Sequence, residues 1–549
     1  MKKYIRFISG LNTFLKGRLS APEAYQGAQN LLKDRIAKRD ENFLNIVDKG
    51  IFSYSKSPYK MLLEPKKIAY RDIKNKVESE GIENTLEWLK SEEVYFTVDE
   101  FKGKVPVKRN GVEFVCKESM FDNPFLSTAY EVRSGATRSA GTRVRIDFDY
   151  LSQRSLYDAY LLHLHGSLTV PIANWFPLFP GAPGINSSLR FSRIGNPPQK
   201  WFSQVEKAQI KVNWEKTWGT ELIFFMSRLH GMSLAKPEYV SLNHAHKIAR
   251  WASAMLDHYP NCVIYTFATS AVRVCMAAKE NGYNIKGTRF LVTGETLTGQ
   301  KRKEIESVGA VAIPVYGISE AGVIAAGCEK HNNCSSSHGG SDHCHLYKDT
   351  TAVITHKQRV PHFDLIVDSF LFSSLLYESP KLLLNVGMGD YGSVYTKATN
   401  CGFGKIGFDT HITNIKSYEK LTGEGVTFVD TDFIRIIEKD LPSKFGGSST
   451  DYQLVEEEDE KGFNRLRLFV SPTLGTIRED ELVTFFMNSL KQSESSPESW
   501  AQSGSEMWNQ ARTIRIKREH PATTPSGKIL PFHIQSNAPA NLKRITKGE

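Results

Sequence analysis

Hydrophobic positions in the middle of this chain follow two different periods. Between residues 245 and 395, short apolar runs alternate with segments whose apolar residues recur at helical spacing. The pattern predicts strands at Cys262–Phe267, Thr288–Thr293 and Val311–Val315, and helices at His246–Asp257, Ala271–Gly282 and Thr298–Val308. Alternation of strands with helices predicts a parallel sheet, whose ligand crevice lies beyond the carboxyl ends of the strands.

The regions on either side of this pattern differ from it. Residues 1–95 are charged and favour helix, and an amino-terminal helical face carries the apolar side chains Ile5, Ile8, Leu11 and Leu15. We expect that face to pack on the body of the protein rather than to touch a membrane surface. Short strands follow, including Val112–Cys116, and residues 150–165 favour a helix.

The composition changes again at Lys416–Gly425, a charged segment containing two glycines. Beyond it we predict helices at Thr431–Leu441 and Glu479–Leu490, strands around Asp451–Glu456, Arg465–Val470 and Thr513–Lys517, and a polar loop at Gln492–Ser505. The predicted fold class is therefore α/β, with a large N-terminal domain (residues 1–415) of parallel sheets flanked by helices, in which residues 1–95 form a helical extension. A small, mobile α+β C-terminal domain (residues 416–549) follows a hinge near Lys416–Gly423.

Composition limits the class of protein. A chain of 549 residues exceeds one hydrophobic core, so at least two domains are expected. The formal net charge is +10, and the absence of a long basic block argues against nucleic-acid binding. No apolar stretch is long enough for a transmembrane helix, and Arg6 interrupts the first apolar run, which disfavours a secretory signal. Seven cysteines, an odd number, fit a reduced, cytoplasmic protein.

Five short segments carry candidate chemistry. Tyr316–Gly322 follows a predicted strand, so we expect a loop whose hydroxyl and carboxylate could hold a phosphate and its metal ion. Ser134–Arg143 alternates hydroxyls with small residues, which lets backbone amides approach a phosphate, but it lacks the ending of a P-loop. The others are Gly294–Thr298, which could equally be a helix start, Asn385–Asp390, an Asp-containing turn, and Thr523–Lys528, a surface turn ending in lysine.

In this order, and with a charged hinge before the last segment, these motifs resemble the acyl-adenylate-forming superfamily. That superfamily contains acyl- and aryl-CoA synthetases, nonribosomal adenylation domains and luciferases. The nearest resemblance is to its phenylacetate–CoA ligase-like branch, and it spans roughly residues 95–535, which is most of the chain.

The resemblance implies how ATP would be bound. The β- and γ-phosphates would be held by the loop that contains Ser134, Gly135, Thr137 and Thr142. Gly294 and Glu295 match the loop that flanks adenine, and Tyr316, followed by Gly317, matches the aromatic residue against the adenine ring. Asp390 matches the aspartate that binds the ribose hydroxyls.

The resemblance also implies the reacting groups. Ser319 stands where the family contacts the α-phosphate, Glu320 matches the glutamate that binds Mg²⁺, and Lys528 matches the lysine that bridges carboxylate and α-phosphate. The segment Lys416–Gly425 matches the hinge and the loop that enters for the second step. The sequence departs from the family at Arg138 and Arg143, where Gly, Pro and Lys are usual, and it has no evident arginine before the hinge. The nearby substitutes are Lys405, Asn414 and Lys416.

A possible metal site lies in residues 328–345, which are rich in cysteine and histidine. Zinc prefers four thiolate or imidazole ligands, and we predict a structural zinc bound by Cys328, His331, Cys334 and Cys344. Some members of the resembled branch carry a zinc near this place, partly through the cysteine around Cys401. The alternative is a His/Cys-rich loop without metal. Mg²⁺ belongs with ATP instead, because phosphate oxygens are hard ligands.

The resemblance implies an acid–thiol ligase that uses ATP and Mg²⁺ to form an acyl-AMP. The acceptor would be coenzyme A or the phosphopantetheine of an acyl carrier protein. An aryl or aliphatic carboxylic acid is expected, because Trp175, Phe176 and Phe179 could line an apolar pocket, although they could equally be core. Two alternatives stay open: transfer to an amine or hydroxyl, and a non-catalytic, zinc-bearing binding protein with a degenerate adenylation fold.

Overall fold

A twelve-stranded sheet forms the body of the protein. The computed structural model describes residues 2–109, 111–126, 130–133, 143–178, 183–206, 214–330, 340–360, 366–418, 420–423, 426–492, 498–521, 529 and 532–534. The strands of the large sheet follow the order β13-β14-β15-β16-β12-β11-β10-β9-β8-β5-β6-β7. Strand β10 joins an antiparallel half to a parallel half, because it pairs antiparallel with β11 and parallel with β9.

The half from β10 to β7 is parallel, as the alternating pattern predicted. Its strands are β5 (Ile172–Trp175), β6 (Lys200–Ser203), β7 (Pro237–Tyr239), β8 (Val263–Phe267), β9 (Arg289–Thr293) and β10 (Val311–Ile318). Every residue of β5 and β8 is buried, which explains their continuous apolar runs. The strand order reverses between β5 and β8, the kind of place where sheets of this type bind ligands.

The other half of the sheet is antiparallel, which the sequence did not predict. Its strands are β11 (Gly322–Ala326), β12 (Cys344–Leu346), β13 (Thr351–Arg359), β14 (Ile366–Ser374), β15 (Val386–Thr396) and β16 (Thr410–Ser417). Two short hairpins accompany it, β1 (Val107–Arg109) with β2 (Val112–Phe114), and β3 (Tyr130–Arg133) with β4 (Arg143–Ile146). The prediction of an α/β fold with a large sheet and flanking helices is confirmed.

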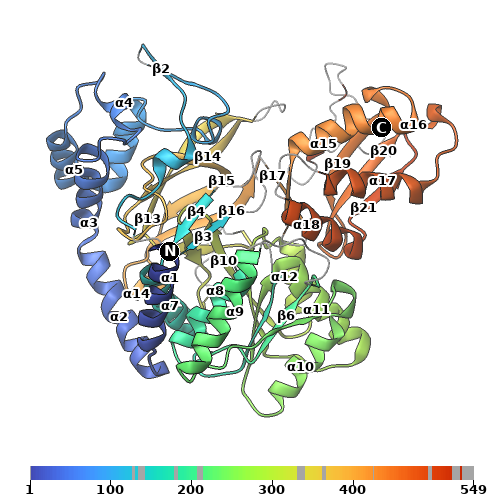
Figure 1. Cartoon of the computed structure of the whole chain (residues 1–549), viewed down its shortest axis with the longest axis horizontal. Coiled ribbons are helices and arrows are strands. Elements are labelled where there is room, and N and C mark those ends of the chain that lie inside the picture. Colours follow the sequence, from blue (N-terminus) through green and yellow to red (C-terminus); the bar gives the residue numbers. More distant parts are fainter. Residues whose placement is uncertain are drawn as a thin grey trace.

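Helices α10, α11 and α12 (green in Figure 1) lie together beside the parallel half. Helix α11 ends at Gly282, whose positive φ of 70° suits a helix C-cap, and α12 begins after Thr298, whose side chain accepts the backbone N–H of Lys301. The helices of this part are α7 (Phe148–Leu164), α8 (Pro183–Arg193), α9 (Trp214–Leu229), α10 (His246–Leu256), α11 (Ala268–Asn281), α12 (Gly299–Glu306) and α14 (Gly402–Lys405).

The amino-terminal region is helical, as expected. Its helices are α1 (Lys2–Lys16), α2 (Ala21–Ala37), α3 (Arg39–Ile46), α4 (Lys60–Leu63), α5 (Tyr70–Ser91) and α6 (Val98–Phe101). Helix α1 buries Leu11 and Leu15, whereas Ile5 and Ile8 of the predicted face are 61% and 39% exposed. In the part of the chain that the structure describes, no helix combines the length and apolar character needed to cross a bilayer.

The C-terminal elements form a separate group, orange and red in Figure 1. A four-stranded sheet has the order β21-β20-β19-β22, from β19 (Tyr452–Glu458), β20 (Asn464–Val470), β21 (Ile514–Lys517) and β22 (Phe532–Ile534). The accompanying elements are the hairpin β17 (Lys420–Gly423) and β18 (Val426–Val429) and the helices α15 (Asp430–Arg435), α16 (Leu441–Phe445), α17 (Glu479–Lys491) and α18 (Glu498–Ala511). The predicted loop Gln492–Ser505 is wrong from residue 498 onward, because α18 buries Ala501 and Trp508.

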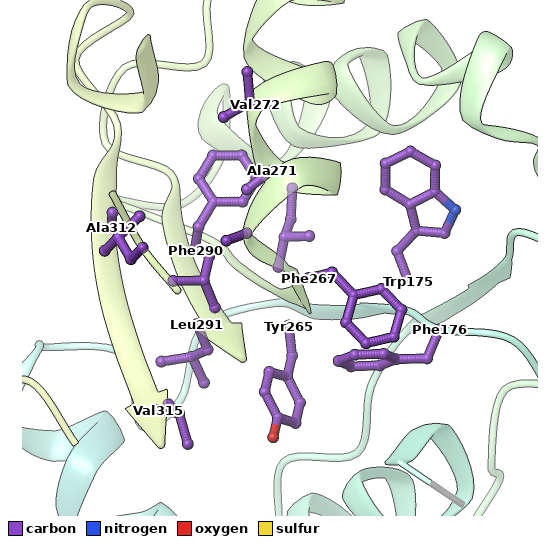
Figure 2. Close-up of a cluster of buried hydrophobic side chains, with 14 of the residues drawn as sticks. Trp175, Phe176, Tyr265, Phe267, Ala271, Val272, Phe290, Leu291, Ala312 and Val315 are labelled. Atoms are coloured by element: carbon purple, nitrogen blue, oxygen red, sulfur yellow. The ribbon is translucent and has the colours of Figure 1, made fainter. Parts of the chain in front are cut away.

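Aromatic residues that could have lined an acid pocket lie in the core of the parallel half. Figure 2 shows Trp175 and Phe176 among buried side chains of this cluster. The Phe176 ring lies 4.9 Å from that of Tyr265 and 5.0 Å from that of Phe267, centroid to centroid. Both Trp175 and Phe176 are 0% exposed, so they are core, whereas Phe179 lies outside the described residues.

Replacing Phe176 by Ala should lower the free energy of unfolding by about 3–5 kcal/mol, because the change leaves a cavity among packed rings. Phe225, which is 60% exposed, is the matched control, and its replacement by Ala should cost less than about 1 kcal/mol. Denaturant unfolding followed by fluorescence measures both. An unchanged transition for F176A would contradict the assignment of Phe176 to the core.

Candidate functional site

A cavity of about 410 Å³ lies beyond the carboxyl end of β9 and beside the last residues of strand β10, from Pro314 to Gly317. Strand β9 stops at Thr293, whereas β10 continues past Pro314, its last residue that pairs with β9, and leaves Tyr316 and Gly317 beside the cavity. The heptad predicted as a loop is therefore mostly strand. Residues 316–318 extend β10 because β11 pairs with them, and the turn is confined to residues 319–321.

The loop after β9 requires glycine at its first position. Gly294 has φ +77°, and a Cβ built there would lie 2.9 Å from Cδ1 of Phe267. The following Glu295 accepts a hydrogen bond from Thr269 and forms an ion pair with Lys301 at 3.3 Å. The side chains of Glu295 and Lys301 are each 1% exposed, so this carboxylate holds the loop against α12.

Tyr316 and Asp390, predicted to contact adenine and ribose, meet in this cavity. The Tyr316 hydroxyl donates to Oδ2 of Asp390 at 2.9 Å. Burial and the neighbouring carboxylate raise the pKa of Tyr316 well above its ordinary value, so the phenol remains a donor. Asp390 does not lie in a turn as expected but within β15, where the register with β16 shifts between Tyr391 and Ser393. Such a bulge re-aims side chains.

Asp342 and Lys416 form another wall of the cavity. Asp342 accepts the backbone N–H groups of Asn414 at 2.8 Å and Ile415 at 2.7 Å. Burial lowers the pKa of Lys416, while Asp342 and Glu458 favour its charged form. Of the three substitutes for the missing arginine, Asn414 and Lys416 border the cavity, whereas Lys405 lies in α14 and is not part of the described lining.

The last wall comes from the C-terminal sheet. We call β19, β20 and the residues between them the acidic hairpin (residues 452–470). Its residues Glu456, Glu457, Glu458 and Asn464 border the cavity. The pKa of Glu456 is raised to about 7, mainly because the side chain is buried. The positive charge of Lys301 acts to lower this pKa, and the negative charge of Glu458 acts to raise it. Part of the Glu456 population is therefore protonated at neutral pH.

Several predicted residues lie elsewhere. Ser319 is exposed and Glu320 is buried in the turn between β10 and β11, and the described lining includes neither. The predicted residues Ser134, Gly135, Thr137, Thr142 and Lys528 lie outside the described residues, as do Arg138 and part of the segment Lys416–Gly425. Lys416 itself pairs with Tyr391 in the large sheet, so the chain leaves this sheet only after Ser417.

Arg143, one of the departures from the family pattern, has a structural partner. Its guanidinium lies 2.6 Å from Oδ2 of Asp122, whose other oxygen binds Nζ of Lys381 at 2.7 Å. The backbone N–H of Lys381 donates to the carbonyl of Glu320 at 3.3 Å. This chain of contacts ties the base of the β3–β4 hairpin, which encloses residues 134–142 in sequence, to the turn that carries Glu320.

The cysteine and histidine residues group differently from the prediction. Cys328, His345 and Cys401 are buried, and their ligand atoms all lie within 4.8 Å of one another. His345 Nδ1 contacts the carbonyl of Phe408 at 2.7 Å, which leaves Nε2 toward Cys401 Sγ at 3.3 Å. The hydrogen bond from Cys328, and then that from His345, hold the pKa of Cys401 below its ordinary range.

Cys344, predicted as a zinc ligand, lies outside this group of three. The Sγ of Cys344 donates a hydrogen bond to the carbonyl of Asp342 at 3.3 Å. Cys344 borders the cavity, because alternate residues of β12 face opposite sides of the sheet. Cys328, also a predicted zinc ligand, is in the group, while His331 and Cys334 lie outside the described residues. The sequence did not single out His345 for this group, since many spacings in a histidine-rich segment are equally plausible ligand sets.

Three further lining residues were missed: Lys301, Asp342 and Glu456. Lys301 looked like an ordinary helix surface residue, and Glu456 belongs to a distant strand that only tertiary packing brings to the cavity. Asp342 was hidden within the cysteine- and histidine-rich segment. No local sequence signal separates these residues from solvated charges.

The fold has known relatives. No family model matches the sequence, and no curated protein matches it. Among solved structures, the chain matches a 2-hydroxyisobutyryl-CoA ligase in complex with 2-HIB-AMP and CoA in the thioesterification state, with TM-score 0.51 and 12% identity over 91% of this chain and 90% of that one. An open conformation of that ligase matches with TM-score 0.42 and 13% identity over 90% of this chain and 92% of that one. An amide bond synthetase from Marinactinospora thermotolerans matches with TM-score 0.38 and 12% identity over 88% of each chain.

The first of these likenesses shows the fold, and at 12% identity it shows the fold alone. The chain shares its fold with this CoA ligase, and the fold agrees with the one that the motif order predicted. The lower scores of the other two matches add nothing to this.

Replacing Gly294 by Ala should lower the free energy of unfolding by about 1–3 kcal/mol, because Ala is strained at positive φ and its Cβ would meet Phe267. Gly299 is the matched control: it starts α12, and a Cβ there meets nothing within 4 Å. G299A should be neutral or stabilising by up to about 1 kcal/mol. Thermal unfolding of both variants measures this, and equal effects would contradict the loop geometry.

Proposed function

We propose that this protein activates a carboxylic acid with ATP, forming an acyl-AMP and releasing pyrophosphate. The observation that carries the proposal is the hydrogen-bonded pair of Tyr316 and Asp390 in the cavity at the ends of β9 and β10. The phenol ring of Tyr316 is suited to contact an adenine ring, and the carboxylate of Asp390 is suited to bind ribose hydroxyls. The two side chains lie beside the loop that begins at Gly294. The fold supports the same reading, because ligands bind at this edge of such sheets.

In the proposed reaction the acid's carboxylate attacks the α-phosphorus of ATP, and pyrophosphate leaves. Negative charge grows on the phosphoryl oxygens, and groups already in place would offset it. We assign this work to Lys528, to the hydroxyl of Ser319 and to the 134–142 loop, with Glu320 holding Mg²⁺. Mg²⁺ would neutralise phosphate charge and orient the leaving group.

We propose a thiol as acceptor in a second step, either coenzyme A or a carrier-protein phosphopantetheine. The C-terminal elements would turn about the chain after Ser417, so that the part of the predicted small domain (residues 416–549) that follows Ser417 is mobile. Transfer to an amine or hydroxyl is the alternative, and the geometry of the cavity does not favour it over a thiol. The acid is aryl or aliphatic in this proposal, with its pocket formed by residues other than Trp175 and Phe176, which are core.

ATP–pyrophosphate exchange across a panel of aryl and aliphatic acids tests the first step. K528A and E320Q should each lower the exchange rate by about 100-fold or more, because each removes stabilisation of the transferring phosphoryl group. K517A and E460Q, changed at side chains away from the cavity's described lining, should retain exchange.

The result that would overturn adenylation is a folded parent protein with no exchange on any acid, or K528A with full activity. Preformed acyl-AMP, offered coenzyme A, phosphopantetheine or amines, then separates the acceptors. Consumption by amines alone would replace the thiol proposal without affecting the first step.

A second proposal concerns the buried group Cys328, His345 and Cys401, which we infer holds a structural zinc. The donor set fits, since two thiols and an imidazole supply three of the four soft ligands that tetrahedral zinc takes. The N–H of Gly404 also donates to Cys401 Sγ at 3.3 Å, which favours a thiolate. Cys334, close to Cys328 in sequence, is our choice for the fourth ligand.

Metal analysis of the purified protein tests this inference. The parent should carry about one zinc per chain, and C401S should lose most of it because a ligand is missing. C344S is the matched control, since Cys344 is buried in the same segment but bonds Asp342, and it should keep the zinc. Loss of zinc from C344S, with retention in C401S, would restore the ligand set predicted from sequence.

A further inference from the structure

An exposed apolar surface lies where helices α1 and α9 run side by side (Figure 1). Two contacts fix how the helices pair. The rings of Tyr4 and Trp218 meet edge to face with their centroids 5.5 Å apart, and Nε2 of His230 lies 3.0 Å from Oδ1 of Asn12. The two helices therefore run in the same direction along one seam, from the amino end of each toward its carboxyl end.

Helix α1 turns only the later part of its predicted apolar face toward the core. Leu11 and Leu15 are buried in a hydrophobic cluster that also contains Ile223 of α9. Ile5 and Ile8, one and two turns earlier, are 61% and 39% exposed. Ile8 stands one turn from each of the α1 residues that make the two contacts above, so it borders the seam.

Helix α9 continues this surface on the other side of the seam. Trp218, Phe225 and Leu229 recur at spacings of seven and four residues, which places them on one face of the helix, and they are 41%, 60% and 69% exposed. Single exposed apolar side chains are ordinary, whereas a group of them marks a surface with a partner. We call this group the apolar seam, which consists of Ile5, Ile8, Trp218, Phe225 and Leu229.

The charge around the apolar seam is mainly positive. The sequence of α1 contains four basic residues and no acidic residue. Arg6 follows Ile5, Arg228 precedes Leu229, and both arginines are exposed. Glu221 of α9 is exposed nearby and has the opposite sign, so the cationic character is partial. The formal net charge of +10 for the chain adds a long-range attraction to anionic surfaces.

This combination of side chains suits the surface of a lipid bilayer. Trp, Phe, Leu and Ile enter the boundary between headgroups and acyl chains, and neighbouring arginines contact the phosphates of anionic lipids. A second copy of this chain suits the surface less well. A symmetric pair would place the same surface on both sides, and its arginines would then face one another.

We propose that the apolar seam is a peripheral docking surface for an anionic lipid bilayer. Helices α1 and α9 lie along the membrane surface in this arrangement, and neither crosses it. The three most exposed members, Leu229, Ile5 and Phe225, enter the apolar layer, while Arg6 and Arg228 stay among the headgroups. The inference goes beyond the proposed adenylation and uses none of its residues.

Co-sedimentation of the full chain with lipid vesicles tests the proposal. Vesicles of phosphatidylcholine with about 30% phosphatidylglycerol should bind the parent about tenfold more tightly than vesicles of phosphatidylcholine alone. Raising the salt concentration from about 0.1 M to about 0.5 M should remove most of that difference, because salt screens the arginines from the lipid phosphates. Equal binding to both kinds of vesicle, or binding to neither, would overturn the proposal.

The apolar contribution is tested by F225A/L229A. This double variant should bind the anionic vesicles about tenfold more weakly, because two apolar side chains no longer enter the bilayer. V115A/I366A is the matched control, since Val115 and Ile366 are 59% and 66% exposed outside α1 and α9, and it should bind as the parent does. Thermal unfolding should show that both double variants are folded. Undiminished binding by F225A/L229A, or an equal loss in the control, contradicts the proposal.

The charged contribution is tested by R6Q/R228Q. This double variant should bind the anionic vesicles about tenfold more weakly and should bind neutral vesicles as the parent does, because only the attraction to lipid phosphates is lost. R71Q/R250Q removes two exposed arginines from α5 and α10 and lowers the net charge equally. It should weaken binding less than about twofold. An equal effect of the two double variants would assign binding to net charge and overturn the docking surface.

Trp218 reports the contact directly, because it is the exposed tryptophan among those that the structure describes. Lipid labelled with bromine should quench the fluorescence of the parent on anionic vesicles, and W218F should lose most of that quenching. Full quenching in W218F would place the lipid contact elsewhere and refute the proposal.

Sedimentation equilibrium without vesicles tests the rival occupant of the apolar seam. A parent dimer that F225A/L229A converts to a monomer would assign the surface to a second copy of the chain, whereas a monomeric parent supports the bilayer. No nucleotide enters any of these experiments, so failure of the docking surface leaves the proposed adenylation as it stands.

Discussion

The site depends on one constraint, the unequal lengths of two neighbouring parallel strands. Strand β9 ends at Thr293 and β10 runs on to Ile318, so β10 exchanges a parallel neighbour on one side for the antiparallel β11 on the other. The space beside this overhang cannot be filled by the sheet itself. The Gly294 turn, Asp390 and the acidic hairpin surround it, and every proposed function of the protein uses the opening that remains.

The parallel half could be predicted because its signals are local. Runs such as Val263–Phe267 are buried on both faces, so their apolar character is continuous and their helices follow at regular spacing. The antiparallel half pairs strands through long-range register, which leaves no such trace. Helix α18 was missed because its apolar positions, including Ala501 and Trp508, are spread among Ser, Gln and Glu.

Residues that border the cavity could be found from the sequence where residue identity singles them out, and not where tertiary packing brings them there. Tyr316 and Asp390 were found as separate motifs and meet through a hydrogen bond. The three glutamates of the acidic hairpin could not be found, since a run of acidic residues on a strand usually faces solvent. Its place in the cavity lining distinguishes Glu456 from that expectation, and loss of solvent there raises its pKa to about 7.

Strand β12 places the two proposed sites of this protein back to back. Its residues alternate between faces, so Cys344 borders the cavity beside β10 while His345 turns to Cys401 and Cys328. Asp342, just before the strand, accepts the backbone N–H groups of Asn414 and Ile415 on the cavity side. A metal bound by His345 would therefore fix the position of the strand that shapes the cavity wall, without touching a nucleotide. This is a physical reason for a structural metal to lie in a protein whose proposed chemistry uses a different ion.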